Sequence, residues 1–414
     1  MKIIPTKKQL EFLDWEFGVF FHFGIRTFYD GHKDWDMQEM PLSGFNPENL
    51  DCEAWIKTVK DAGATYAILV CKHHDGFANW PSKYTDYSVA NTTWKDGKGD
   101  VVLEFVNACR KYDIKVGLYY SPAEFGSNDK NNKQYDEYFI NQVSELLTNY
   151  GKVHYLWFDA CGSEGHVYNT ELIVGKIREL QPDILIFNMW DPDTRWVGNE
   201  AGLAQSPCLN TVDGIDFSVQ TDVKTKLEDE MFLPAECDCR MRYENWFYSD
   251  TDEDTVKTLD ELIGLYYYSV GRGTNLLINI GPNRQGLLPD KDSGNLIALG
   301  NEIKRRFSNP LDCEITNNFD IYTIDLGTRK LVNHLIVQED LLSGEHIEFF
   351  EIYVRPNFQG EDILVYQGNT IGHKAICSFP TASTTQIVLK IASEDNNFKL
   401  RSINPYYVRG YQIE

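Results

Sequence analysis

The sequence is poor in positive charge. Lysine and arginine together number 39 against 62 aspartates and glutamates in 414 residues, which gives a formal net charge of −23. A chain with this deficit repels polyanions, so nucleic acids and anionic membrane surfaces are excluded as natural partners. A neutral ligand is compatible with this charge.

Long apolar runs are missing as well. No stretch approaches the roughly 20 apolar residues of a membrane-spanning helix. Gln9, Glu11 and Asp14 interrupt the N-terminal segment before any apolar run reaches the length found in signal peptides. We therefore expect a soluble, cytoplasmic protein with no membrane partner. An export signal removed beforehand would leave the same sequence and would make the protein a secreted one.

The nine cysteines lack the spacing of a metal site or of a disulfide framework. Their number is odd, and only Cys237 and Cys239 are close neighbours. Zinc sites in small domains repeat pairs of ligands at short fixed spacings, and disulfide-rich domains carry an even set of cysteines. This usage indicates reduced thiols. Disorder is excluded too, because 42% of the residues are hydrophobic and 24% are charged, as in ordinary globular proteins.

The first 309 residues alternate short apolar, β-rich runs with segments of helical period. This alternation is typical of βα units around a parallel sheet. The predicted strands are 18–23, 66–71, 114–120, 153–159, 184–189, 232–237 and 275–280, and the predicted helices are 52–62, 101–112, 134–149, 171–180, 256–270 and 294–307. Asp100 is the predicted N-cap of the second helix. Seven or eight such units in about 300 residues predict a TIM-type barrel.

The pattern changes after Pro310 to alternating apolar and polar residues with turn signals between the runs. Such alternation is typical of the strands of a β-sandwich. We therefore predict a barrel domain over residues 1–310 and an antiparallel β-sandwich over residues 311–414. The second domain carries 14 acidic and 8 basic residues, so both domains share the negative charge. Two roles remain open for it, a carbohydrate-binding module or a brace for the barrel.

Polar and aromatic side chains gather at the predicted strand ends. The C-terminal ends of all barrel strands open on one cavity, where TIM-barrel active sites lie. The residues concerned are His22, His73, His74, Tyr119, Tyr120, Trp157, Asp159, Glu236, and, on the loop after the fifth strand, Arg195, Trp196 and Glu200. Indole rings pack against the C–H face of a sugar, while imidazole, phenol and guanidinium groups bind its hydroxyls. The set therefore predicts a sugar site.

Glycoside hydrolysis needs two carboxyl groups, one to attack or stabilise the anomeric carbon and one to protonate the leaving oxygen. Asp159 is our first choice for the former. Strand alternation places Tyr155, Trp157 and Asp159 on one face, so an aromatic ring lies one layer beneath the acid. Asp159 could also be a structural carboxylate that caps the following loop.

Several of these residues have simpler interpretations. His73 and His74 might suggest a metal site, but adjacent strand residues project to opposite sides, so we expect no metal and no other cofactor. Taken alone, His22 is typical of a hydrogen-bonded core histidine, and Trp157 of barrel packing. The acidic run 250–254 lacks the order of an EF-hand and predicts a solvated loop.

Five segments of the barrel half together carry a family resemblance: 17–24 (FGVFFHFG), 67–77 (AILVCKHHDGF), 116–121 (VGLYYS), 156–159 (LWFD) and 275–282 (NLLINIGP). In this order they resemble the motifs of the α-L-fucosidases of glycoside hydrolase family 29. The resemblance implies a distorted (β/α)8 barrel with a C-terminal β-sandwich, a retaining two-step mechanism, and Asp159 as the nucleophile. It also implies a fucose site lined by His22, His73, His74, Tyr119 or Tyr120, Trp157 and Trp246.

The resemblance is less uniform for the general acid/base. The run 195–202 (RWVGNEAG) resembles the family branch that prefers fucose linked α-1,3 or α-1,4 beside a branching galactose, which implies Glu200 as the acid/base. Glu236 is the alternative. The segment 240–248 departs from the family pattern, because it lacks the small residues that usually precede Trp246. The implied substrate is a fucosylated oligosaccharide. A fucosidase of another linkage preference, or a glycan-binding protein without catalysis, remains an alternative.

Overall fold

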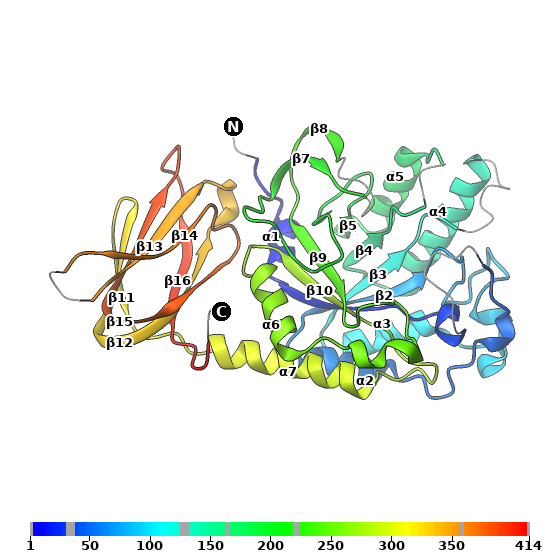
Figure 1. Cartoon of the computed structure of the whole chain (residues 1–414). Helices are drawn as coiled ribbons and strands as arrows, with labels where there is room; N and C mark the ends of the chain where they lie inside the picture. Colours follow the sequence, from blue (N-terminus) through cyan, green and yellow to red (C-terminus); the bar gives the residue numbers. More distant parts are fainter. Residues whose placement is uncertain are drawn as a thin grey trace.

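The computed structural model describes residues 3–29, 38–124, 132–162, 166–217, 224–356 and 360–411. The chain forms a parallel barrel and an antiparallel sandwich that lie side by side (Figure 1). Helix α7 runs beneath the barrel and leads towards the sandwich (Figure 1). It ends at Phe307, and the first sandwich strand begins at Glu314, on either side of the domain boundary that the sequence predicts.

Eight parallel strands form the barrel, in the order β5-β4-β3-β2-β1-β10-β9-β6. An additional parallel bridge between Phe187 and Thr194 brings the two edges of this sheet together. The strands are β1 Phe17–Phe21, β2 Tyr66–Lys72, β3 Lys115–Tyr120, β4 Tyr155–Phe158, β5 Leu185–Phe187, β6 Arg195–Trp196, β9 Ala235–Arg240 and β10 Asn275–Ile280. The predicted TIM-type barrel is confirmed.

Helices cover most but not all of the strand connections. They are α1 Lys7–Leu13, α2 Cys52–Asp61, α3 Val101–Lys111, α4 Asn132–Asn149, α5 Thr170–Leu180, α6 Leu259–Tyr268 and α7 Asp290–Phe307. The predicted cap at Asp100 is present, since its carboxylate accepts the N–H of Leu103 at 2.8 Å. Within the described ranges, no helix joins β5 to β6, and a hairpin of β7 (Thr211–Ile215) and β8 (Thr225–Phe232) stands between β6 and β9. None of the helices described has the length and apolar character needed to span a bilayer.

The predicted strand 232–237 is wrong in its bounds. Phe232 ends the hairpin strand β8, and barrel strand β9 starts only at Ala235. Pro234 lies between them, and proline cannot donate a hydrogen bond to a neighbouring strand. Glu236 consequently lies at the beginning of a barrel strand rather than at its end, which changes its place in the site.

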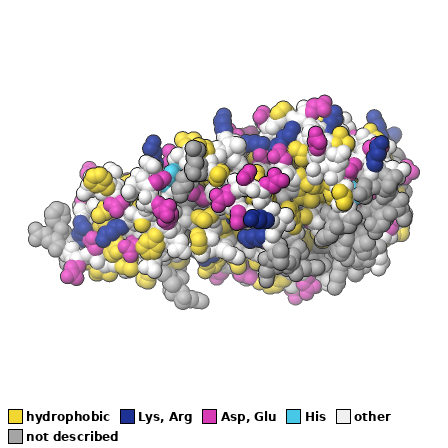
Figure 2. Space-filling view, turned by 90° about the horizontal axis from the view of Figure 1, so that it is seen from above, with side chains coloured by type: hydrophobic (Ala, Val, Ile, Leu, Met, Phe, Trp, Pro, Cys, Tyr) yellow, Lys and Arg dark blue, Asp and Glu magenta, His cyan; other side chains and the backbone are white. Residues whose placement is uncertain are grey.

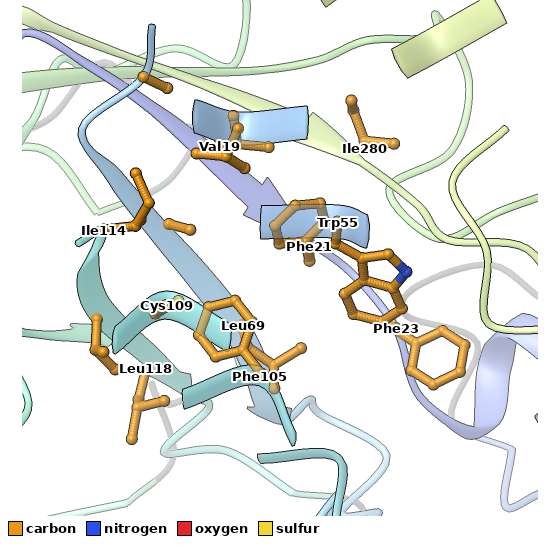
Figure 3. Close-up of a cluster of buried hydrophobic side chains, with 14 of the residues drawn as sticks. Val19, Phe21, Phe23, Trp55, Leu69, Phe105, Cys109, Ile114, Leu118 and Ile280 are labelled. Atoms are coloured by element: carbon orange, nitrogen blue, oxygen red, sulfur yellow. The ribbon is translucent and has the colours of Figure 1, made fainter. Parts of the chain in front are cut away.

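Two apolar layers hold the barrel together. One fills the interior and includes Phe20, Tyr155 and Trp157, and the other lies between the strands and the surrounding helices. Figure 3 shows part of the outer layer, where Trp55 of α2 packs beside Phe21 of β1 with ring centroids 5.3 Å apart. Burying each such side chain contributes about 1.5 to 3 kcal/mol. The layers leave the C-terminal strand ends fixed in place.

The C-terminal domain is antiparallel, as predicted. Its strands are β11 Glu314–Asn318, β12 Ile321–Glu339, β13 Phe349–Arg355, β14 Ile363–Gly368, β15 Ala375–Ala392 and β16 Leu400–Tyr406. The long pair β12 and β15 carries register shifts, which allow such long strands to bend. Strand β13 alternates buried and half-buried residues, and its inward side chains join a core separate from that of the barrel.

Candidate active site

Asp159 directly follows β4, at the C-terminal end of the barrel. Its Oδ2 accepts a hydrogen bond from the Tyr119 hydroxyl at 2.8 Å and lies 3.4 Å from Nε2 of His74, while Oδ1 accepts the N–H of Cys161 at 2.9 Å. Burial opposes ionisation, but the charge and hydrogen bond of His74, together with the other donors, outweigh it and lower the pKa of Asp159. The carboxylate is therefore ionised at neutral pH.

His22 lies beside this carboxylate as a neutral imidazole. Burial lowers its pKa to about 3. Asn279 donates through Nδ2 to the Trp246 carbonyl at 2.7 Å, so its Oδ1 is the acceptor that faces Nδ1 of His22 at 2.7 Å. His22 Nδ1 must then carry the proton, which leaves Nε2 as an acceptor for a ligand hydroxyl. The ring packs against Trp246, with centroids 4.9 Å apart.

His73 and His74 lie together, contrary to the expectation that they project to opposite sides. Their ring centroids are 4.2 Å apart because β2 ends at Lys72 and strand alternation no longer applies. His73 stacks on Tyr119 and is buried, and in the part of the chain that the structure describes its Nδ1 has no hydrogen-bond partner. Such a buried polar atom is satisfied when a ligand hydroxyl reaches it.

The same arrangement brings three metal-ligand atoms close together. One atom each of His73, His74 and Asp159 lies within 4.8 Å of the others. One ring nitrogen of His74 is already engaged, because Nδ1 lies 2.6 Å from Ser121 Oγ. The expectation that the site works without a metal remains a prediction.

Glu200 lies on the loop that follows β6 and is half-buried. Burial raises the pKa of its carboxyl group, and the negative charge of Asp159 raises it further, against the opposing charge of Arg240 and a hydrogen bond from Trp246. The structure thus combines an ionised carboxylate with a second carboxyl group whose pKa is raised.

The loop around Glu200 has a tight, glycine-dependent path. Gly198 and Gly202 have φ of 99° and 75°, values that favour glycine. A Cβ at Gly202 would lie 2.9 Å from Cys239 Sγ of β9. The Asn199 side chain accepts the N–H of Ala201 at 3.0 Å. These features hold the loop against the end of β9.

Glu236, the sequence's alternative acid, lies deeper than predicted. It is fully buried, and its carboxyl group accepts hydrogen bonds from Tyr66 at 2.6 Å, Trp157 at 2.8 Å and Tyr155 at 3.4 Å. Burial raises its pKa to about 7 despite these donors. Trp157 and two tyrosines thus surround its carboxyl group inside the barrel, a setting that favours Glu200 over Glu236 as the acid/base.

Trp157 forms the layer between Glu236 and the site. Its indole stacks on Phe187, with centroids 4.0 Å apart, and on Tyr119, with centroids 5.4 Å apart. It is almost completely buried. The expected aromatic layer beneath the acid is therefore present, and Trp157 supports Tyr119 from below.

Two predicted sugar-binding residues lie elsewhere. Tyr120 points to the other face of β3, where its hydroxyl donates to Gln142 Oε1 at 2.7 Å in the layer beneath the helices. Arg195 is buried and donates to the Leu209 carbonyl at 2.9 Å. Neither side chain joins the group around Asp159, because strand alternation turns Tyr120 away and Arg195 binds a backbone segment.

Arg240 and Asp238 also lie near the site, although no sequence motif points to them. Arg240 lies over the Trp246 ring, 5.4 Å from its centroid, and its charge acts on Glu200. Asp238 accepts a hydrogen bond from the Trp196 indole at 2.7 Å. With the correct bounds of β9, the period-two rule places Glu236, Asp238 and Arg240 on the interior face. Correct strand bounds would therefore have identified both.

An ionised carboxylate and a second carboxyl group of raised pKa, at the C-terminal end of a TIM barrel and among neutral imidazoles and aromatic rings, are typical of a glycoside hydrolase of the two-carboxylate type. The comparisons identify the family. A sequence model described as "Alpha-L-fucosidase" matches residues 5–306. The chain belongs to the α-L-fucosidase family, glycoside hydrolase family 29.

Relatives extend the similarity over both domains. Alpha-L-fucosidase 1 of Arabidopsis thaliana is 32% identical over 91% of this chain and 82% of its own length. A crystal structure of a glycoside hydrolase 29 family member from an unknown rumen bacterium is 30% identical with a TM-score of 0.87, over 99% of this chain and 78% of that one. A Ruminococcus gnavus fucosidase solved in complex with fucose is 25% identical with a TM-score of 0.84, over 98% of this chain and 95% of that one.

Proposed function

We propose that this protein is a retaining exo-α-L-fucosidase that releases terminal α-L-fucose from oligosaccharides or glycoconjugates. The family supplies the substrate class. The observation that carries the proposal is the opposite pKa shift of two carboxyl groups in one site, lowered in Asp159 and raised in Glu200. Retaining glycosidases need this combination of one ionised and one protonated group.

In the first step, Asp159 Oδ attacks the anomeric carbon of fucose and forms a covalent ester. The bond between that carbon and the leaving oxygen breaks, and the oxygen takes the proton of Glu200. Tyr119 and His74 stabilise the carboxylate before attack, since both contact Asp159 Oδ2. The attacking oxygen is consequently held in a fixed orientation.

In the second step, the Glu200 carboxylate removes a proton from water, and the oxygen of that water attacks the anomeric carbon. The ester to Asp159 breaks, Asp159 is again a carboxylate, and Glu200 is again protonated. Two inversions at the same carbon give fucose of retained configuration. The mechanism requires the two pairs of carboxyl oxygens to lie about 5 to 5.5 Å apart around the bound sugar.

Fucose recognition follows from the groups around Asp159. His22 Nε2 is available as an acceptor, and His73 Nδ1 as a second polar contact, so each can bind one hydroxyl of the sugar. The Trp246 indole offers an apolar face that suits the C–H groups of a pyranose. The Ruminococcus gnavus relative solved in complex with fucose supports this assignment.

For the linkage we propose α-1,3 or α-1,4. The run 195–202 resembles the branch with this preference, and its glutamate, Glu200, is the residue whose charge interacts with Asp159. The buried position of Glu236 supports the same choice, because it removes the alternative acid.

The direct test is release of the chromophore from an aryl α-L-fucoside. We expect turnover by the native protein and a loss of at least about a thousand-fold in Asp159→Ala, because the nucleophile is removed. Asp183→Asn, at an exposed aspartate, is the matched control and should leave turnover unchanged. Binding of fucose without turnover by the native protein would identify a glycan-binding protein instead.

A panel of fucosylated oligosaccharides tests the linkage. We expect release from Lewis-type trisaccharides with α-1,3- or α-1,4-linked fucose and little from α-1,2- or α-1,6-linked substrates. Preferential release from the latter pair would contradict the branch assignment while leaving the fucosidase assignment intact.

A further inference from the structure

Two buried charged side chains hold the segment 208–211 from different directions. Arg195 of β6 donates to the Leu209 carbonyl at 2.9 Å. Glu345 of the C-terminal domain accepts the N–H groups of Asn210 and Thr211, both at 3.0 Å, and the side-chain amide of Asn210 at 2.9 Å. The exposed fractions of Arg195 and Glu345 are only 6% and 8%. The sandwich therefore reaches into the barrel and contacts it through a carboxylate.

The position of Glu345 is fixed by the surrounding contacts of the sandwich. It closely follows the 3₁₀ turn η7 (Leu341–Ser343), and Leu341 packs with Leu13 and Phe232 of the barrel in a small apolar cluster. Burial raises the pKa of Glu345, and the three N–H donors and the charge of Arg195 oppose this rise only in part. Burying a carboxyl group between two domains costs free energy, and the group here fixes the geometry of the segment that it binds.

Arg195 connects this segment to the loop that carries Glu200. Arg195 and Trp196 form β6, which pairs with Ala235 and Glu236 of β9. The loop with Glu200 begins at the next residue, Val197. The Arg195 side chain also donates to the Trp196 carbonyl at 3.3 Å, directly before this loop, so it links the segment 208–211 to the start of the loop.

We propose that Glu345 is a positioning residue that lets the C-terminal sandwich hold Glu200 in place for proton transfer. Glu345 orients the segment 208–211, this segment holds Arg195, and Arg195 holds the start of the loop with Glu200. The sandwich then contributes to protonation of the leaving group and not to the binding of fucose. This inference rests on the proposed role of Glu200 as acid/base.

The test measures kcat/KM for a series of aryl α-L-fucosides whose phenols differ in acidity. An acidic phenol leaves without protonation, whereas a weakly acidic one needs the general acid. For Glu345→Gln we expect kcat/KM within two-fold of the native value with the most acidic phenol, and a loss of about 10- to 100-fold with the least acidic, as misplacement of a catalytic group causes. The loss should grow steadily across the series.

The matched control is Arg401→Gln. Arg401 also joins the two domains, through an ion pair with Asp14 at 2.6 Å, but this pair is half-exposed and involves neither Arg195 nor the segment 208–211. Its variant should show the native dependence on the phenol. An equal loss on all substrates in Glu345→Gln, or no loss on any, would overturn the proposal, because either result shows that proton transfer is not affected.

Glu200→Gln, measured on the same series, separates this inference from the proposed function. If kcat/KM depends more steeply on the acidity of the phenol in Glu200→Gln than in the native protein, but Glu345→Gln behaves like the native protein, only the positioning role is overturned. A native dependence in Glu200→Gln overturns the acid/base assignment itself. If Glu345→Gln does not fold, Arg195→Lys tests the same connection from the barrel side, because lysine keeps the charge but lacks the guanidinium fork. This variant should lose kcat/KM selectively on the least acidic phenols. If its kcat/KM instead varies with phenol acidity as in the native protein, the proposal is overturned.

Discussion

The surroundings of Asp159 favour its ionised form, and those of Glu200 favour its protonated form. This difference predicts the pH dependence of catalysis. Asp159 must be ionised, so activity is lost as pH falls through its pKa, which is lowered from 3.8. Glu200 must be protonated, so activity is lost as pH rises through its pKa, which is raised from 4.5. We expect a bell-shaped profile of kcat/KM on a substrate that needs acid assistance.

Glu200→Gln provides the control for this profile. Glutamine cannot titrate, so the fall at high pH should disappear while the fall at low pH remains. A profile that keeps its high-pH fall in this variant would assign that titration to another group.

The buried Glu236 leads to a second prediction, on the pH dependence of stability. Its pKa is about 7 in the folded protein against 4.5 for an ordinary glutamate, so the native state binds this proton more tightly. Protonation of Glu236 therefore adds about 3 kcal/mol to the free energy of unfolding. This contribution is complete below pH 4.5 and is lost as pH rises through 7. The Glu236→Gln variant lacks this change.

The measurement is urea unfolding of the native protein and of Glu236→Gln between about pH 4 and pH 8. Glu339 also has a raised pKa of about 7, so only the difference between the two proteins isolates Glu236. The variant should gain stability relative to the native protein as pH rises. A constant difference would show that Glu236 does not titrate in this range.

Sequence motifs located Asp159, Glu200 and the histidines but not the depth of each side chain. The predicted strand 232–237 puts Glu236 near a strand end because it includes Pro234, whereas Pro234 in fact separates two strands. Arg195 has the residue type of a sugar contact, and its true partners lie in segments distant in sequence. Long-range contacts of this kind leave no local pattern in a single sequence.

At the scale of elements, the barrel units with a clear helical period were predictable and the irregular ones were not. The predicted strand 275–280 and helix 52–62 agree with β10 and α2 almost to the residue. The connection from β6 to β9 instead contains a hairpin, whose exposed strand β8 carries charged residues. Such a strand lacks the apolar alternation that identifies buried strands.

The loop after β9 illustrates how a departure from the family pattern is accommodated. Arg242 is buried and pairs with Asp252 and Asp292, each at 2.9 Å, and Asp252 also accepts the side-chain amide of Asn245 at 2.9 Å. The expectation of a solvated acidic loop is therefore wrong for Asp252, which is fully buried. This network holds the residue before Trp246.

Arg242→Met should destabilise the protein by about 3 to 5 kcal/mol, because it leaves two buried aspartates without their partner. Lys57→Met is the control, since Lys57 forms only an exposed ion pair with Asp61, which contributes little to stability. Thermal or urea unfolding measures both. Equal, small effects would show that the Arg242 network does not hold the loop.

At the scale of the whole molecule, charged contacts join the two domains. Glu16 of the barrel pairs with Lys374 and lies 3.5 Å from His373 of the sandwich. Burial opposes its ionisation, but these partners lower its pKa to about 2. The resulting stability is present above the ordinary pKa of 4.5 and is lost as pH falls through 2.

We expect Glu16→Gln to be less stable than the native protein by about 3 kcal/mol at neutral pH, with the difference shrinking as pH falls below 4.5. Urea unfolding at several pH values checks this. The Arg401→Gln variant should change stability by less than about 1 kcal/mol, because its ion pair is half-exposed. A difference that persists at low pH would contradict the assignment to the Glu16 charge.

The surface of the molecule agrees with a neutral substrate. Figure 2 shows acidic side chains spread among basic ones over this face of both domains, without one dominant basic area. On this face, the acidic side chains that contribute to the net charge of −23 are spread rather than gathered in one area. A neutral glycan approaches such a surface without the repulsion that a polyanion meets.

Trapping the covalent bond between Asp159 and fucose tests the proposed mechanism at its first chemical step. A 2-deoxy-2-fluoro-fucosyl fluoride forms the ester but slows its hydrolysis, because fluorine destabilises the oxocarbenium-like transition state. After digestion, mass spectrometry should find one fluorofucosyl group on the peptide that contains Asp159, and none in Asp159→Ala. A label on another residue, or turnover without any label, would show that Asp159 is not the nucleophile.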